Sequence, residues 1–180
     1  MGALVLRRLG ERHGIEVGKR RHQALVGRGE IAGREVVLAF PQTFMNNSGD
    51  AVRRLLAFYE LTPAHLLVIS DDLNLELGDL RLRRGGSDGG QKGLRSIIQH
   101  LGTPDFARLR LGIGRLEAGR DATDFVLSPF RRSELDRVEE LVDRGADAVQ
   151  LALRDGLEAA MNRYNARPEP PDLNGRPAPQ

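Results

Sequence analysis

The stretch LLVISDD, residues 66–72, decides the fold class of this 180-residue chain. It follows Pro63 and is a short, continuous apolar run that ends at two aspartates. A run of this kind, without polar alternation, is typical of a strand buried on both faces, as the strands of parallel sheets are. The stretch therefore predicts an α/β fold in which Asp71 and Asp72 stand at the carboxyl end of one strand.

Helical and strand patterns alternate on both sides of this strand. Those before it predict a helix over 3–12 that Gly14 would end, a hairpin with strands at 23–31 and 34–40 around Gly33, and a helix from Ser48 to about residue 60 that Asn47 or Ser48 would cap. Those after it predict strands in DLRLRR (79–84) and FARLRLGIG (106–114), a helix in LRSIIQHL (94–101), and a long helix near Ser133, whose spacing to Asp136 resembles a capping box. This alternation predicts one α/β domain with a mixed sheet.

The composition is that of an ordinary globular protein, with 40% hydrophobic and 29% charged residues. No apolar run approaches the ~18 residues of a membrane helix, and the first residues lack a signal-peptide pattern. The absence of cysteine excludes disulfides and thiolate metal sites, so we expect a cytoplasmic protein, although an exported protein without cysteine fits this observation too. The cationic residues are 25 Arg and 2 Lys, which fits phosphate binding and fits the codon usage of a GC-rich genome equally well.

Two polar segments follow apolar strands and could converge on one crevice at the carboxyl edge of the sheet. Asp71 and Asp72 fit acid–base or metal chemistry, but they also fit a turn or a cap, and no third acidic ligand accompanies them. Asn46 and Asn47 fit a turn, whereas amides directly after Phe44 also suit the stacking and edge recognition of a base. Both alternatives stay open at this point.

The glycine-rich loop GGSDGGQKG, residues 85–93, matches neither the Walker pattern nor G-x-G-x-x-G. Basic residues gather around it, which suits a nucleic-acid backbone or a merely solvated face; they are Arg81, Arg83, Arg84, Lys92 and Arg95. None of the four histidines has the spacing of a known catalytic motif. The residues alone therefore do not identify a general base.

Four segments together resemble the bacterial-type peptidyl-tRNA hydrolase family in order and spacing. They are PQTFMNNSGDAV (41–52), the stretch from VISDD to GIGR (68–115), DFVLSPF (124–130) and DGLEAAMNRYN (155–165). The resemblance implies a single domain over 1–165 with a mixed, twisted sheet, followed by a Pro-rich tail, residues 166–180, that we expect to be disordered. It also implies a monomer that hydrolyses the ester between a peptide and the 3′-terminal ribose of tRNA, with no metal, cofactor, membrane or obligate protein partner.

The family's roles can be carried onto matching positions. In the family a histidine is the general base; Asp71 matches the aspartate that orients it, Asn46 matches the asparagine that holds water and substrate, and Phe44 matches the aromatic residue at the substrate's terminus. The basic positions implicated in holding tRNA match Arg81, Arg83 and Arg110. The family loop GGHNG reads GGQKG here, so Lys92, which cannot accept a hydrogen bond, replaces an asparagine that helps to hold water and the tRNA end.

The family also begins with a strand, a turn, a tyrosine and the motif R-H-N-x-G, whose last two positions align with Met1 and Gly2. We therefore expect the first strand and the catalytic histidine to lie upstream of Met1, through a wrongly assigned start. The 180-residue chain by itself is then expected to be inactive or poorly folded. The alternative is a family member that has lost catalysis and binds RNA.

Overall fold

The computed structural model describes residues 1–115, 125–126 and 128–165, and the predicted tail over 166–180 lies outside these residues. The elements in the first half are α1 (Gly2–His13), β1 (Lys19–Arg21), β2 (Ala24–Ile31), β3 (Arg34–Pro41), the 3₁₀ turn η1 (Met45–Asn47), α2 (Ser48–Phe58), the 3₁₀ turn η2 (Pro63–His65) and β4 (Leu67–Asp72). They are followed by β5 (Leu80–Arg83), α3 (Lys92–Leu101), β6 (Ala107–Gly112), the 3₁₀ turn η3 (Arg132–Glu134), α5 (Leu135–Asp155) and α6 (Leu157–Tyr164). Helices and strands alternate as predicted.

The expected mixed sheet has the strand order β4-β6-β5. Strand β4 runs parallel to β6, while β5 runs antiparallel to it. The apolar run of the opening stretch is thus confirmed as a strand with a parallel neighbour. The predicted hairpin is confirmed as β2 and β3, which form a second, antiparallel three-stranded sheet with β1.

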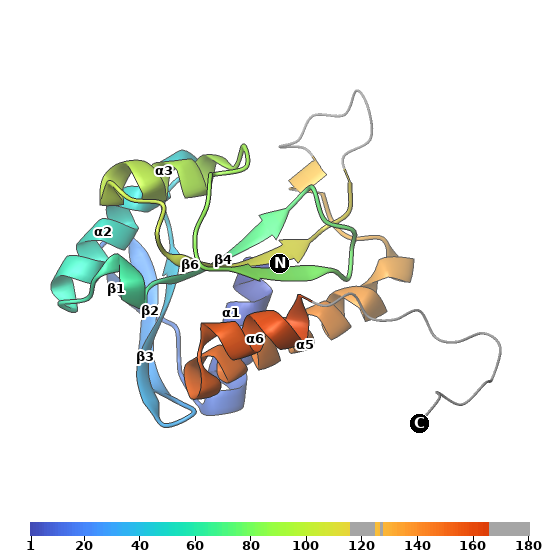
Figure 1. The fold of residues 1–180 in the computed structure, drawn as a ribbon, viewed down its shortest axis with the longest axis horizontal. Coiled ribbons are helices and arrows are strands. Elements are labelled where there is room, and N and C mark those ends of the chain that lie inside the picture. The colour runs from blue at the N-terminus through green and yellow to red at the C-terminus, as the bar shows by residue number, and fades with distance from the viewer. Residues whose placement is uncertain (116–124, 127, 166–180) are drawn as a thin grey trace.

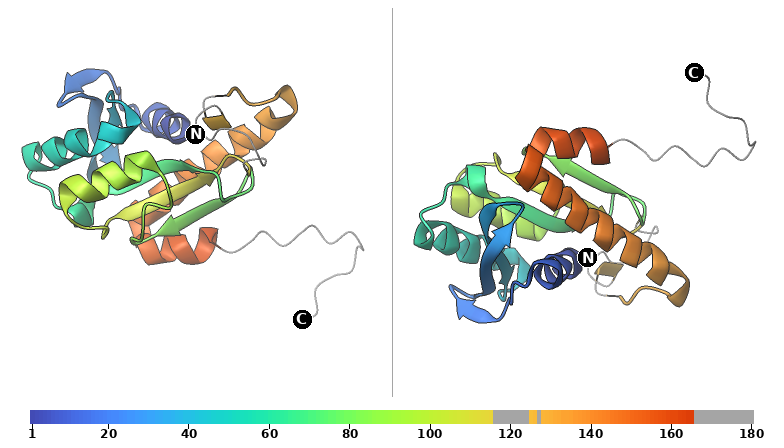
Figure 2. Two further views of the ribbon diagram at one scale, coloured as in Figure 1. Left: turned by 90° about the horizontal axis from the view of Figure 1, so that it is seen from above. Right: turned by 90° about the horizontal axis from the view of Figure 1, so that it is seen from below.

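Helices lie on both faces of the mixed sheet, with α3 on one side and α1, α5 and α6 on the other (Figure 1). The larger core lies on the second side, where Leu109 and Leu111 of β6 are fully buried among residues of α1 and α5. Each such side chain contributes about 1.5–3 kcal/mol relative to an exposed one. A smaller core joins α2 and α3 around Phe106. Figure 2 shows α2 and the start of α5 at opposite ends of the molecule.

Helix ends agree with the sequence in part. Gly14 ends α1 in the left-handed conformation, with φ 63°, as predicted. The predicted cap of α2 is wrong, because neither Asn47 nor Ser48 accepts from the first helical amides, and the hydroxyl of Ser96 on α3 accepts from the N–H of Gly49 instead, at 3.0 Å. The predicted Ser133 box at the start of the long helix is also wrong: Glu134 bonds back to the N–H of Arg131, one turn earlier.

Within the described ranges, no helix is both long enough and apolar enough to cross a membrane.

Candidate functional site

The two aspartates at the end of β4 point to opposite faces of the sheet. Asp72 is fully buried, pairs with the guanidinium of Arg110 and accepts from the N–H of Asn74 at 2.8 Å. Asp71 remains 29% exposed and faces the amino end of α1. Because successive side chains of a strand alternate, the two carboxylates cannot share a ligand, and the open alternative of a carboxylate pair is excluded.

The carboxylate of Asp71 meets the start of the chain. Its Oδ1 accepts from the N–H of Gly2 at 2.9 Å and lies 3.1 Å from the amino group of Met1. The approach is close, since a Cβ on Gly2 would stand 2.8 Å from the carbonyl oxygen of Ile69 on β4. Asp71 is therefore a half-exposed acceptor held at the amino end of α1.

The glycine-rich loop is tied to the same strand end by Gln91. Its Nε2 donates to the main-chain oxygen of Asp71 at 2.7 Å. Gln91 also stands immediately before the first residue of α3, so this bond sets where α3 begins relative to β4. Lys92, the next residue, is exposed at the amino end of α3, where the helix dipole disfavours a cation. Nothing in the structure explains this choice of residue.

The segment with Phe44 and Asn46 lies against the start of α3. A Cβ on Gly93 would lie 3.3 Å from Cγ of Met45, so η1 and α3 are in contact. The Phe44 side chain is 88% exposed, and Asn46 is exposed as well. No other residue of the described chain hydrogen bonds to the Asn46 amide, which therefore has both its donor and its acceptor available. The strand end of Asp71, the glycine-rich loop and η1 thus converge at one edge of the sheet.

The predicted arginines lie on the two neighbouring strands, on the face opposite the larger core. In the register of β5 and β6, Arg81 stands opposite Arg110 and Arg83 opposite Arg108. Like charges directly opposite destabilise a sheet unless they are compensated. Arg110 is compensated by buried Asp72, and Arg81 donates to the main-chain oxygen of Asn165 at 2.7 Å. Arg83 is exposed.

Arg108 was not predicted and is the most buried of the four, with 3% of its surface exposed. Its guanidinium donates to the carbonyl oxygens of Gly86, Ser87 and Pro104, and so anchors the first half of the glycine-rich loop. Burial, followed by the charge of Arg110, lowers the pKa of Arg108 below its ordinary value. The positive charge on this face is concentrated enough for one guanidinium to disfavour another.

None of the four histidines lies at the strand end that bears Asp71. Nδ1 of His65 contacts the Thr62 hydroxyl at 3.0 Å, and Nδ1 of His100 lies 2.8 Å from the carbonyl oxygen of Ser96. The ring of His22 lies 5.1 Å from that of Phe58, and His13 ends α1. None of them contacts Asp71 among the described residues.

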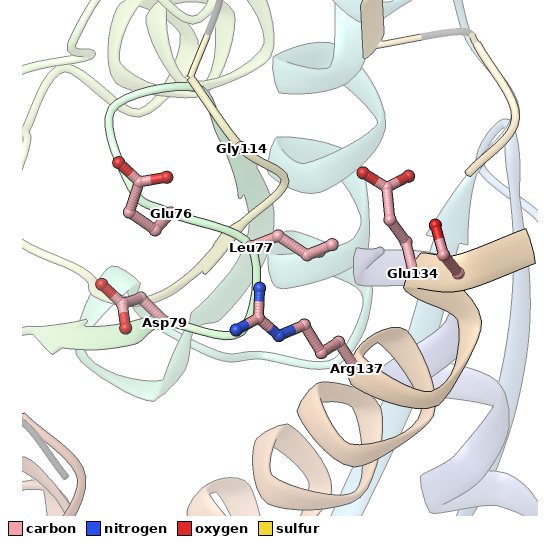
Figure 3. Close-up of a pocket in the computed structure, with 7 residues that line it drawn as sticks. Glu76, Leu77, Asp79, Gly114, Glu134 and Arg137 are labelled. Carbon is pink, nitrogen blue, oxygen red and sulfur yellow. The ribbon is translucent and has the colours of Figure 1, made fainter. Parts of the chain in front are cut away.

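A separate pocket of about 760 Å³ lies between the loop that follows Asp72 and the first turn of α5. Figure 3 shows Arg137 reaching from α5 toward the loop at Leu77, with Glu76, Asp79 and Glu134 around it. None of the predicted site residues lines this pocket. In the described part of the chain, no cluster of three or more histidine, aspartate or glutamate side chains has a metal-binding arrangement.

Sequence reasoning missed the residues that hold the loops in place. Gln91, Arg108 and Ser96 act through main-chain groups far away in sequence. The position of Gln91 just before a predicted helix could have drawn attention to it. Its partner could not have been predicted, because that partner is a main-chain oxygen and every residue has one. Arg108 lies on β6 in the same alternation with leucines as Arg110, so the sequence pattern does not show that Arg108 is the buried one.

Comparison with known proteins identifies the family. A family model described as peptidyl-tRNA hydrolase matches residues 1–172. The peptidyl-tRNA hydrolase of Brevibacillus brevis is 44% identical over 165 residues, which are 92% of this chain and 87% of that protein. That of Rhodopirellula baltica is 50% identical over 136 residues, covering 76% of this chain and 72% of that protein.

Solved structures are similar as well. The crystal structure of peptidyl-tRNA hydrolase from Acinetobacter baumannii has a TM-score of 0.84 at 33% identity, over 90% of this chain and 83% of that one. A structure of a peptidyl-tRNA hydrolase in complex with N-propanol has a TM-score of 0.87 at 32% identity, over 94% of this chain and 86% of that one. The resemblance seen in the sequence is confirmed: this chain belongs to the peptidyl-tRNA hydrolase family.

Proposed function

We propose that this protein hydrolyses the ester that joins a peptide to the 3′-terminal ribose of tRNA, and that it does so in the cytoplasm. The observation that carries the proposal is that the glycine-rich loop joins the exposed segment of Phe44 and Asn46 to the strand end that bears Asp71, in a chain of this family. The products are free tRNA and an N-blocked peptide. Water supplies the nucleophile, and its oxygen ends in the peptide carboxylate.

In this proposal Asn46 works on the reacting atoms. Its free amide donates to the carbonyl oxygen of the ester, where negative charge develops as water attacks, and its oxygen accepts from the water. The exposed ring of Phe44 offers a flat apolar surface to the terminal nucleoside. Binding of the phosphates falls to the arginine face of β5 and β6 and to Lys92, which can donate to an anion although it cannot accept from water.

Asp71 acts through the base in this proposal. A carboxylate that accepts from one ring N–H of an imidazole fixes its tautomer and supports its protonated form after it takes a proton from water. No histidine of the described chain is in contact with Asp71. The expectation that the base is a histidine preceding Met1 stays a prediction.

The test is the release of N-acetyl-aminoacid from N-acetyl-aminoacyl-tRNA. It uses the 180-residue chain and a chain with whatever residues the reading frame encodes before Met1. In the active form, Asp71→Ala and Asn46→Ala should each lower kcat/KM by about 10²-fold or more, the usual cost of losing an acid–base or oxyanion group. Asp136→Ala and Asn162→Ala remove the same side chains from exposed helix positions and should leave turnover unchanged.

Two results would count against the proposal. Equal turnover in the Asp71→Ala variant and its Asp136→Ala control would remove the assigned role of Asp71. Tight tRNA binding without cleavage in both forms of the chain would support the RNA-binding alternative instead.

A further inference from the structure

We propose that a second surface, formed by Lys19, Arg20, Arg21, His22 and Phe58 and here called the β1 surface, binds the phosphate backbone of the tRNA at a distance from its 3′ end. None of these residues belongs to the site described above. The inference rests on the proposed function, because it names a further contact with the same substrate.

The first observation is unpaired positive charge. Lys19 and Arg20 are exposed and Arg21 is half-buried, along the whole of the edge strand β1. None of the three makes an ion pair with any described residue, although 11 arginines of the described chain do. Lys19 and Arg21 lie on one face of this edge strand and Arg20 on the other. Without a carboxylate partner they give the strand a positive potential on both faces, which attracts a polyanion such as a phosphate backbone.

The second observation is that aromatic contacts hold this charge in place. The guanidinium carbon of Arg21 lies 4.7 Å from the centre of the Phe58 ring, at the end of α2, and the His22 ring packs against the same ring. Phe58 nevertheless remains 47% exposed. A guanidinium stacked on an aromatic ring keeps the N–H groups around its own edge available for a phosphate. Because the ring already restricts the arginine side chain, little further side-chain freedom is lost when a phosphate binds.

The third observation is the backbone of the turn that delivers these residues. His22 and Gln23 connect β1 to β2 with φ values of 46° and 61°, which is the left-handed region that favours glycine. The side chain of Gln23 donates to Asp50 on α2 at 3.0 Å, so the turn is fastened to the helix. The turn is thus fastened to the first turn of α2 through Asp50, while His22 and Arg21 pack on Phe58 at the carboxyl end of that helix.

The length of α2 indicates which part of the tRNA the β1 surface can contact. Ten helical steps separate Ser48, beside Asn46, from Phe58, a length of about 15 Å. Since phosphates repeat about every 3.4 Å along one strand of a duplex, this length corresponds to about four nucleotides. The Phe58 end of the β1 surface therefore lies about four nucleotides from the terminal nucleoside and is suited to the stem beyond it. Between the two places α2 exposes Arg53 and Arg54, both paired with Asp50.

The test compares two double variants of equal charge. Lys19→Gln with Arg20→Gln removes the two exposed cations of the β1 surface and leaves Arg21 on Phe58, and Arg132→Gln with Arg137→Gln neutralises two exposed arginines at the other end of the molecule. Affinity for deacylated tRNA is measured between 50 and 200 mM salt, and thermal unfolding verifies the fold. We expect the first variant to bind tRNA on the order of tenfold more weakly, with a slope of log affinity against log salt reduced by about two, and the second to bind as the parent does.

A second measurement separates the stem from the 3′ end. Cleavage of an N-acetyl-aminoacyl ester of a single nucleoside should be equal in the parent and in both double variants, because this substrate cannot reach the β1 surface. Unchanged tRNA affinity in the first variant, or an equal loss in the second, would overturn the inference. The tRNA measurement needs no turnover, so a failure of the proposed hydrolysis would appear as absent cleavage and leave the binding result to be judged separately.

Discussion

Gly49 offers a strong test of how the site is assembled, because it is the point where α2 touches α3. A Cβ at this position would lie 2.1 Å from the carbonyl oxygen of Ser96, 2.5 Å from its carbon and 2.6 Å from Nδ1 of His100. Ordinary contacts begin near 3.4 Å. Two of the three atoms belong to the main chain of α3, so no side-chain rotation relieves the overlap. Gly49→Ala must therefore push the two helices apart by more than an ångström.

The cost has two parts. Overpacking of a well-packed contact costs about 1–3 kcal/mol, and more where the backbone must move. The separation also breaks the buried hydrogen bond from the N–H of Gly49 to the hydroxyl of Ser96, at about 1–3 kcal/mol. Together we expect the free energy of unfolding to fall by about 2–6 kcal/mol, which lowers Tm by about 4–24 °C in a domain of this size.

The assay is thermal unfolding followed by circular dichroism, with Gly18→Ala as the matched control, because only the flexible side chain of Glu16 approaches that position, at 3.7 Å. The same displacement moves η1 away from the start of α3, so kcat/KM for peptidyl-tRNA should fall as well, even at temperatures where the variant is folded. A Tm within one or two degrees of the control would refute the reasoning that the two helices meet backbone to backbone.

Three further predictions follow from other contacts. Gln91→Ala removes the 2.7 Å hydrogen bond to the end of β4 and should lower kcat/KM by about threefold to tenfold. Gln99→Ala removes the same side chain from an exposed position on α3 and should leave kcat/KM unchanged. Arg108→Met removes the donors to three carbonyl oxygens; the free energy of unfolding should fall by about 1–3 kcal/mol and limited proteolysis should cut faster within residues 85–91. The hydrogen bond from Arg8 lowers the pKa of Asp143. The stabilisation that the ionised Asp143 gives the folded protein is present above the unfolded pKa of ~3.9 and is lost as pH falls through the lower folded pKa. Asp143→Asn should therefore have a lower free energy of unfolding than the parent in urea at pH 7, and the difference between the two proteins should narrow toward pH 3.

The strands of the mixed sheet could be predicted because the sequence of each strand shows by itself which of its residues are buried. Leu80 and Leu82 alternate with arginines on β5, and Leu109 and Leu111 do so on β6, so each strand carries its own two-residue period. Strand β1 could not be predicted, because Lys19–Arg21 contains no apolar residue. It forms because a tight turn folds it back onto β2, and the turn uses two residues that are not glycine in a conformation that favours glycine.

The predicted helix caps were wrong for a related reason. A cap predicted from sequence assumes that the donor and the acceptor lie within one turn of each other. At α2 the acceptor is Ser96, which is 47 residues away from Gly49 in sequence. The absence of a side chain at Gly49 is what permits this contact, so the same glycine that weakens a local helix prediction creates the tertiary cap.

The paired aspartates show why the site itself could be predicted only in part. The sequence places Asp71 and Asp72 at a strand end, and strand alternation alone requires that they diverge, but it does not say which one faces the crevice. Pairing with β6 decides this, because Arg110 lies on the face to which Asp72 points and neutralises it. Asp71 is thereby left on the other face, where it bonds to the first two residues of the chain, and it is the carboxylate that we propose orients the base. The link from the glycine-rich loop to this strand end comes from Gln91, and Lys92 takes no part in it. The departure at Lys92 should therefore affect contacts to water and substrate more than the placement of the loop.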